Sequence, residues 1–125
     1  MGLRELKRQK LLDAILDETC ALIEEVGYES LQVEEVVRRL EISKPTFYRY
    51  FESKADVLCE VQLRMTRAWT ADVAKLADAG APFAETLDTL ARNIARELLE
   101  EPELNRAVYR HASTVPSPRV REAED

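Results

Sequence analysis

Apolar residues recur at every third or fourth position through most of the chain, which is the spacing of one face of an α-helix. Such stripes run over about residues 6–26 and 33–40, then after residue 54, after residue 83 and, more weakly, over about 102–112. No segment alternates apolar and polar residues in the manner of a half-buried strand. The pattern therefore predicts an all-α fold.

The stripes end at residues that are typical of helix ends. The segments "AGAP" at 79–82 and "EEPE" at 100–103 interrupt the pattern with glycine and proline. Gly27 follows the first stripe directly, where a left-handed cap favours a residue without a Cβ atom. In the Schellman form of such a cap, Tyr28 would contact Ile23.

Two serines are predicted to begin helices. Ser43 precedes a short helix over about 44–51, whose first turn tolerates Pro45 because its missing N–H had no helical partner there. Ser53 precedes a longer helix, and Asp56 stands three residues after it in a capping-box arrangement.

The short helix holds Phe47, Tyr48, Tyr50 and Phe51, which are four of the eight aromatic residues in the chain. Phe47 and Phe51 are four positions apart and share a helix face, with Tyr50 beside them. We expect these rings to anchor the short helix to the two helices before it. Taken alone, such a pair of rings also fits an ordinary hydrophobic core.

The two short helices are joined by only three residues, which is the spacing of a helix-turn-helix unit. The second helix of such a unit lies in the DNA major groove. Lys44, Thr46, Tyr48 and Arg49 fall largely on the surface left by the rings. Their cationic and hydroxyl groups can reach phosphate oxygens or base edges, so the segment predicts a DNA-reading surface.

Charge limits how DNA binding can work, because the chain is acidic overall with a formal charge of −6. Residues 1–60 hold nine Lys and Arg against thirteen Asp and Glu, whereas residues 38–54 hold five cations against two acids. A local basic face is therefore required, with the acids turned away.

Lys54, in the first turn of the long helix, is placed to bind a phosphate. A second basic group near the start of the chain can meet the flanking DNA backbone: Arg4, Lys7, Arg8 and Lys10.

Composition argues against catalytic, metal and membrane functions. His111 is the only histidine, and neighbouring acids on a helix diverge by about 100° and form a solvated face. We expect no enzyme activity, no metal and no cofactor.

Cys20 and Cys59 are interpreted as core thiols, with a disulfide or a redox switch as the alternative. No apolar run approaches the ~20 residues of a membrane span, and the charged start lacks a signal-peptide pattern, so we expect a cytoplasmic protein without a membrane partner.

The stretch "LLDAILDETCALIEEVGYESLQVEEVVRRLEISKPTFYRYFESKADVL" closely resembles the DNA-binding domain of the TetR family of bacterial transcriptional regulators. The resemblance covers about residues 8–68, with the helix-turn-helix motif at about 31–50. It implies a homodimer that binds a palindromic operator in double-stranded DNA, usually as a repressor. It also implies a C-terminal helical domain in which a small-molecule effector of unknown identity binds.

The resemblance also implies roles for single residues. Six positions match the recognition helix of the family: Lys44, Pro45, Thr46, Tyr48, Arg49 and Tyr50. Lys54 matches the phosphate-contacting lysine of the fourth helix. Gln32 stands where the family usually has Thr or Ser, which caps the second helix and touches phosphate, and glutamine is a poorer cap.

Two further departures from the family pattern concern the turn and the length. Glu41 stands where the family usually has glycine in a left-handed conformation, which costs a glutamate about 1 kcal/mol. Family members generally run near two hundred residues, and their last two helices form the dimer interface. We therefore expect residues 69–112 to be a partial, truncated helical domain for ligand binding and dimerisation, and 113–125 to be a flexible tail.

Three functions follow, in order of preference. The first is a sequence-specific DNA-binding transcriptional regulator, a repressor whose helix at about 44–51 enters the operator major groove. The alternative is a shortened interaction protein that pairs with a longer relative and modulates it. The third is a small-molecule-binding domain with a pocket between the fourth and sixth helices, although stripes at helical spacing are more often core.

Overall fold

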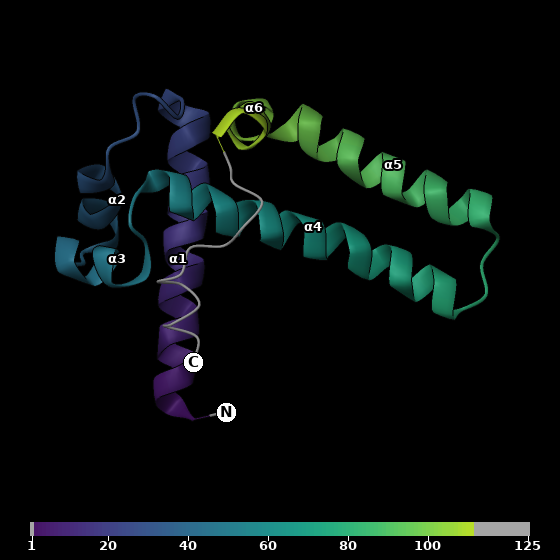
Figure 1. Cartoon of the computed structure of the whole chain (residues 1–125), viewed down its shortest axis with the longest axis horizontal. Helices are drawn as coiled ribbons and strands as arrows, with labels where there is room; N and C mark the ends of the chain where they lie inside the picture. Colours follow the sequence, from purple (N-terminus) through teal and green to yellow (C-terminus); the bar gives the residue numbers. More distant parts are fainter. Residues whose placement is uncertain (1, 112–125) are drawn as a thin grey trace.

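A computed structural model describes residues 2–111 of the chain, and these form six helices and no strand. The all-α prediction is confirmed (Figure 1). The helices are α1 (Leu3–Val26), α2 (Val33–Leu40), α3 (Lys44–Tyr50), α4 (Lys54–Asp78), α5 (Phe83–Glu100) and α6 (Pro102–His111). The segment 113–125, predicted as a flexible tail, lies outside the described residues.

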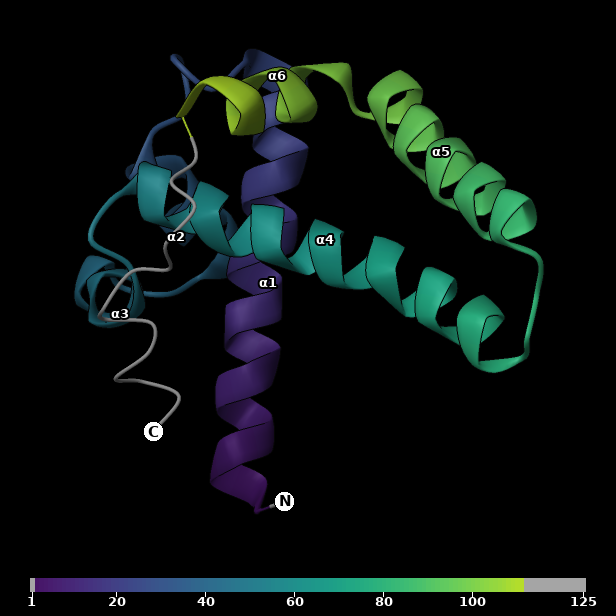
Figure 2. The ribbon, with the colours of Figure 1, turned by 45° about the vertical axis from the view of Figure 1, so that its right-hand side comes forward.

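The helices form one packed unit with an arm that projects from it. α4 crosses α1 (Figures 1 and 2). The short helices α2 and α3 lie on one side of this crossing, and α6 lies across the C-terminal end of α1. The second half of α4 runs outward and α5 returns beside it, so that these two segments make a helical hairpin. The core of buried side chains lies in the packed unit, and α5 has no buried residue.

The aromatic rings of α3, and that of Phe51 directly after it, hold the helix against this core, as the sequence predicted. Phe47 and Phe51 are each 1% exposed and Tyr50 is 6% exposed. The ring centroids of Phe47 and Phe51 are 5.6 Å apart. A helix of seven residues has too few backbone hydrogen bonds to be stable alone, so this burial fixes its position.

The turn after α1 differs from the predicted one. Gly27 adopts φ 83° and ψ 158°, which is a backbone region that essentially only glycine occupies. Its N–H donates to the Ile23 carbonyl at 2.8 Å. The need for glycine is confirmed, but ψ is far from the left-handed helical value, so the predicted Schellman closure with Tyr28 is wrong.

A Schellman closure occurs instead at the end of α2. Glu41 has φ 55° and ψ 40°, and it is the only non-glycine residue with positive φ among residues 2–111. The Glu41 N–H donates to the Arg38 carbonyl at 3.2 Å, and the Ile42 N–H donates to the Val37 carbonyl at 3.0 Å. This is the 5→2 and 6→1 pair that defines the motif. The left-handed turn is therefore retained although a glutamate occupies it.

The predicted serine caps have different outcomes. The Ser43 Oγ accepts a hydrogen bond from the Thr46 N–H at 3.2 Å, and Pro45 lies in the first turn, as predicted. Ser53 precedes α4, but its side chain makes no capping bond. Asp56 Oδ2 accepts from the Glu52 N–H at 2.6 Å, one residue earlier than a capping box requires. The capping-box prediction is therefore wrong, although Asp56 still satisfies a backbone donor.

Both cysteines are free thiols. Cys59 is buried in the core, and Cys20 is half-buried at its edge, where burial raises the pKa of its thiol to about 11. Within the described residues, no helix has the length and apolar character that crossing a bilayer demands.

Candidate DNA-binding surface

The exposed face of α3 carries four of the residues predicted to meet DNA. Lys44, Pro45, Tyr48 and Arg49 are all exposed, whereas Phe47 and Tyr50 of the same helix are buried. The Arg49 guanidinium carbon lies 5.8 Å from the centre of the Tyr50 ring, so the arginine lies over an aromatic face. The helix thus combines an apolar anchor with a polar outer face.

Two other predicted residues of α3 point partly or wholly inward. Thr46 is half-buried, and its hydroxyl lies 2.8 Å from the Ser43 Oγ at the start of the helix. Tyr50 is 6% exposed and belongs to the core. The burial of Tyr50 fits the anchoring role, and leaves little of its side chain available to contact DNA.

The lysine at the start of α3 forms a salt bridge with an acid of α2. The Lys44 Nζ lies 2.7 Å from the Glu34 Oε1 of α2, with both side chains more than half exposed. Hydrogen bonding to the Lys44 ammonium lowers the pKa of Glu34, and the carboxylate in turn raises the pKa of Lys44. In the free protein this cation is therefore paired, and a DNA phosphate would have to replace a carboxylate.

The arginines of α2 are also paired with acids. Arg39 reaches the carboxylates of Glu25 at 3.0 Å and Glu18 at 3.2 Å, both on α1, and that of Glu35 at 3.1 Å. Arg38 also pairs with Glu35, and hydrogen bonds from these two arginines lower the pKa of Glu35 to about 2. Arg39 thus joins α1 to α2. The acids lie among the cations of α2, and the expectation that they turn away is wrong here.

Lys54 holds a loop in a way that the sequence did not indicate. Its Nζ donates to the carbonyls of Tyr28 at 2.8 Å, Leu31 at 3.1 Å and Glu29 at 3.4 Å, which matches the three donors of an ammonium group. The same Nζ lies 4.5 Å from the centre of the Tyr28 ring. Lys54 therefore fixes the α1–α2 loop. Its predicted contact with phosphate stays a prediction.

A hollow of about 270 Å³ brings three predicted site residues together. Gln32 from the start of α2, Tyr48 from α3 and Lys54 from the start of α4 all line it. Gln32 precedes α2 without a side-chain capping bond, as its weak capping ability predicted. The hollow lies where the three helices that present these residues converge, beside the exposed face of α3.

The predicted basic group near the start of the chain lies in α1. Arg4, Lys7 and Lys10 are exposed, while Arg8 pairs with Glu5. Figure 1 shows this part of α1 extending past the other helices of the packed unit. These cations are therefore open to a large polyanion.

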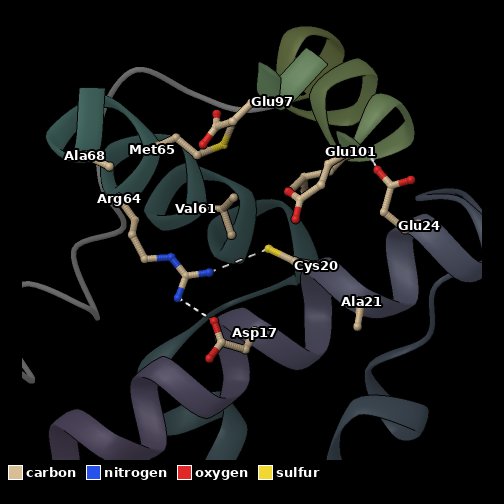
Figure 3. Close-up of a pocket in the computed structure, with 11 residues that line it drawn as sticks. Asp17, Cys20, Ala21, Glu24, Val61, Arg64, Met65, Ala68, Glu97 and Glu101 are labelled. Carbon is tan, nitrogen blue, oxygen red and sulfur yellow. Dashed lines mark hydrogen bonds and ion pairs between the residues drawn. The ribbon is translucent and has the colours of Figure 1, made fainter. Parts of the chain in front are cut away.

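A second cavity lies between α1, α4 and the α5–α6 junction (Figure 3). Its volume is about 380 Å³, which lies within the range of small-molecule sites. Arg64 contacts the Asp17 carboxylate at 2.7 Å and the Cys20 Sγ at 3.8 Å along one wall. Four carboxylates line the cavity: Asp17, Glu24, Glu97 and Glu101. Such a lining favours a cationic or neutral molecule over an anion.

The fold and the exposed face of α3 define the class first: these are the features of a helix-turn-helix DNA-binding protein. Comparison with known proteins then gives the family. Residues 15–61 match the model of the family described as "Bacterial regulatory proteins, tetR family". With the similar proteins described next, this match shows that the chain belongs to the TetR family.

Two similar proteins carry the same name, "HTH-type transcriptional repressor KstR". The one from Mycobacterium tuberculosis is 32% identical over 96 residues, which are 77% of this chain and 44% of that protein. The one from Mycolicibacterium smegmatis is 31% identical over 96 residues, 77% of this chain and 47% of that protein. The chain thus spans a little under half the length of these relatives. No solved structure gave a significant match.

Proposed function

We propose that the chain is a sequence-specific DNA-binding transcriptional regulator, and that it acts as a repressor by placing α3 in the operator major groove. The observation that carries this proposal is the outer face of α3, where Lys44, Tyr48 and Arg49 are exposed on a helix held by buried rings. Membership of the TetR family and the repressor names of the relatives support it.

Some of these residues contact base edges and others contact phosphates. Arg49 can donate two hydrogen bonds to a guanine edge, and the Tyr48 hydroxyl can reach a base or a phosphate. Lys44 exchanges the Glu34 carboxylate for a phosphate, so that binding does not leave the cation unpaired. The exposed cations of α1 contact the flanking backbone.

The operator is palindromic and the regulator is a homodimer, with one half-site for each α3. The DNA-binding domain comprises about residues 8–68, and residues 69–112 form the regulatory part. A small-molecule effector binds in the cavity lined by Arg64 and the four carboxylates, between these two parts.

The experiment that tests the proposal is selection of bound duplexes from random DNA, followed by titration of the enriched sequence at a stated salt concentration. Replacing Arg49 with alanine should weaken binding by about 1–3 kcal/mol, or roughly 5- to 150-fold, and relax the preference at one position. Lys75→Ala is the matched control, because Lys75 is an exposed cation at the far end of α4.

Circular dichroism of each variant establishes that the helices are intact. If the Arg49→Ala and Lys75→Ala variants lost DNA affinity equally, the change in net charge would explain the loss, and a specific contact of Arg49 would not. Folded protein that enriches no sequence would contradict sequence-specific reading altogether.

A second function is favoured by one observation, the exposure of apolar side chains along α5. In this function the chain pairs with a longer TetR-family protein and modulates its binding to DNA. Mixing the chain with such a regulator should produce a mixed dimer in light scattering and release the regulator from its operator. Unchanged mass and unchanged operator occupancy would exclude this role.

A further inference from the structure

The three N–H donors of the Lys54 ammonium group match three backbone carbonyls of the α1–α2 loop. The oxygen of Tyr28 lies 2.8 Å from the Nζ, that of Leu31 lies at 3.1 Å and that of Glu29 at 3.4 Å. An ammonium group has three donors and no acceptor. A DNA phosphate could therefore bind this group only by replacing at least one of the carbonyls.

Lys44 shows what a cation that exchanges its partner easily looks like. Its Nζ pairs with the Glu34 carboxylate at 2.7 Å, and the two side chains are 52% and 56% exposed, so water can solvate the acid once a phosphate replaces it. Lys54 is half-buried, and its bonds to the carbonyls of Tyr28 and Leu31 are partly shielded from solvent. Breaking those bonds leaves acceptors without a donor, which is unfavourable. Lys54 is therefore the less suitable of the two lysines for a phosphate contact.

The carbonyl of Leu31 connects Lys54 to the start of α2. This carbonyl and the N–H of Gln32 belong to one planar peptide group, so a hydrogen bond that fixes the carbonyl also fixes the direction of the N–H. Gln32 is exposed and directly precedes α2, and its own carbonyl accepts the first hydrogen bonds of that helix, from Glu35 at 3.0 Å and Val36 at 3.4 Å. Lys54 thus orients the residue from which α2 begins.

The start of α2 is part of the surface that meets DNA in the proposed function. Gln32, Tyr48 and Lys54 line the same hollow of about 270 Å³. Because α2 has only eight residues, its own backbone hydrogen bonds do not suffice to hold it in place. A loop released from Lys54 would let Gln32 move relative to Tyr48, and the surface would no longer match the duplex.

We propose that Lys54 is a positioning residue for DNA reading, which acts through the α1–α2 loop and the start of α2 in place of the phosphate contact that the family resemblance implies. This inference rests on the proposed function, because it needs an operator that the chain binds. Changing Lys54 should weaken that binding by loosening the surface. The number of phosphates that the surface neutralises should stay the same.

A Lys54→Arg variant separates the two roles. A guanidinium group keeps the charge and binds phosphate at least as well as an ammonium group, so this change would preserve a phosphate contact. Its planar fork does not fit three carbonyls that converge on one compact ammonium group. Lys54→Arg should therefore weaken operator binding at least about fivefold, close to the effect of Lys54→Met.

The dependence of affinity on salt gives a second readout. Loss of one phosphate contact reduces the slope of log affinity against log salt concentration by about one. Both Lys54 variants should keep the slope of the unaltered chain in fluorescence anisotropy with the enriched duplex. Lys44→Met is the matched control and should reduce the slope by about one, because Lys44 contacts a phosphate in the proposed function.

Amide hydrogen exchange of the free protein tests the positioning role without DNA. The amides of Leu31, Glu35 and Val36 donate within the loop and the first turn of α2, and they should exchange at least about fivefold faster in both Lys54 variants. The ring of His111 still stacks on that of Tyr28, with centroids 4.4 Å apart, so the loop should loosen without unfolding of the chain. Circular dichroism checks that the helices remain.

Three outcomes would overturn the proposal. If Lys54→Arg binds the operator as tightly as the unaltered chain, a positive charge at this position is sufficient. If Lys54→Met lowers the salt slope by about one and leaves amide exchange unchanged, Lys54 contacts a phosphate. If selection enriches no duplex, the proposed function fails and the role in DNA reading fails with it, whereas unchanged amide exchange in Lys54→Arg refutes the positioning role alone.

Discussion

Replacing Glu41 with glycine should stabilise the protein, because Glu41 is held in a left-handed conformation by the closure at the end of α2. Its φ of 55° brings the Cβ atom too close to the backbone, which costs about 1–2 kcal/mol for a residue other than glycine. Glycine removes that cost but makes the unfolded chain more flexible, which offsets about 0.5–1 kcal/mol. The net gain should be about 0.5–1 kcal/mol, or roughly 2–5 °C in Tm for a chain of this size.

The assay is urea unfolding followed by circular dichroism, with Glu41→Ala as the matched control. Alanine removes the same charge as glycine but keeps a Cβ atom, so it should leave the free energy of unfolding nearly unchanged. Glu41→Asn should fall between the two, because asparagine tolerates this conformation better than most residues. If the alanine variant is stabilised as much as the glycine variant, the charge of Glu41 is responsible and the backbone explanation is refuted.

Three further predictions concern the charged residues of the DNA-binding unit. Glu34→Gln should free Lys44 and strengthen DNA binding several-fold at low salt, with a steeper dependence of affinity on salt; an unchanged salt slope in fluorescence anisotropy would contradict this. Because the folded-state pKa of Glu35 is lowered from 4.5 to about 2, its pairing stabilises the fold above pH 4.5, and this contribution is lost as the pH falls toward 2. The difference in unfolding free energy between the native chain and Glu35→Gln should therefore shrink over that range. Lys54→Met should lower the free energy of unfolding by about 1–3 kcal/mol, because three loop carbonyls lose their donor. Unchanged stability with weaker DNA binding would instead support the phosphate contact.

Helix positions could be predicted from the sequence because each depends on local information. The period of the apolar stripes gives the buried face, and Ser43 with Pro45 marks the start of α3 through contacts within four residues. The burial of Phe47 and Phe51 followed from their spacing on one helix. These features require no knowledge of how the helices pack.

The features that were missed depend on contacts between distant residues. Lys54 donates to carbonyls 23 to 26 residues earlier in the chain, and only the approach of α4 to the α1–α2 loop brings them together. The pairing of Lys44 with Glu34 likewise depends on the angle between α2 and α3. At Gly27 the residue type indicated that the backbone needs a residue without a Cβ atom. It did not indicate the ψ angle, which distinguishes one helix cap from another.

The docking of α6 determines which parts of the chain should open together. Leu104 and Ala107 of α6 are buried in the same core as the helix-turn-helix unit, and the Leu104 N–H donates to the Glu24 carboxylate of α1 at 2.8 Å. At the other end of α6, the ring of His111 stacks on Tyr28 at 4.4 Å. The free energy of local opening should therefore not follow the order of the helices along the chain. Amide protons of α6 should exchange with solvent as slowly as those of the core, while those of α5, which precedes α6, exchange by opening of the arm alone.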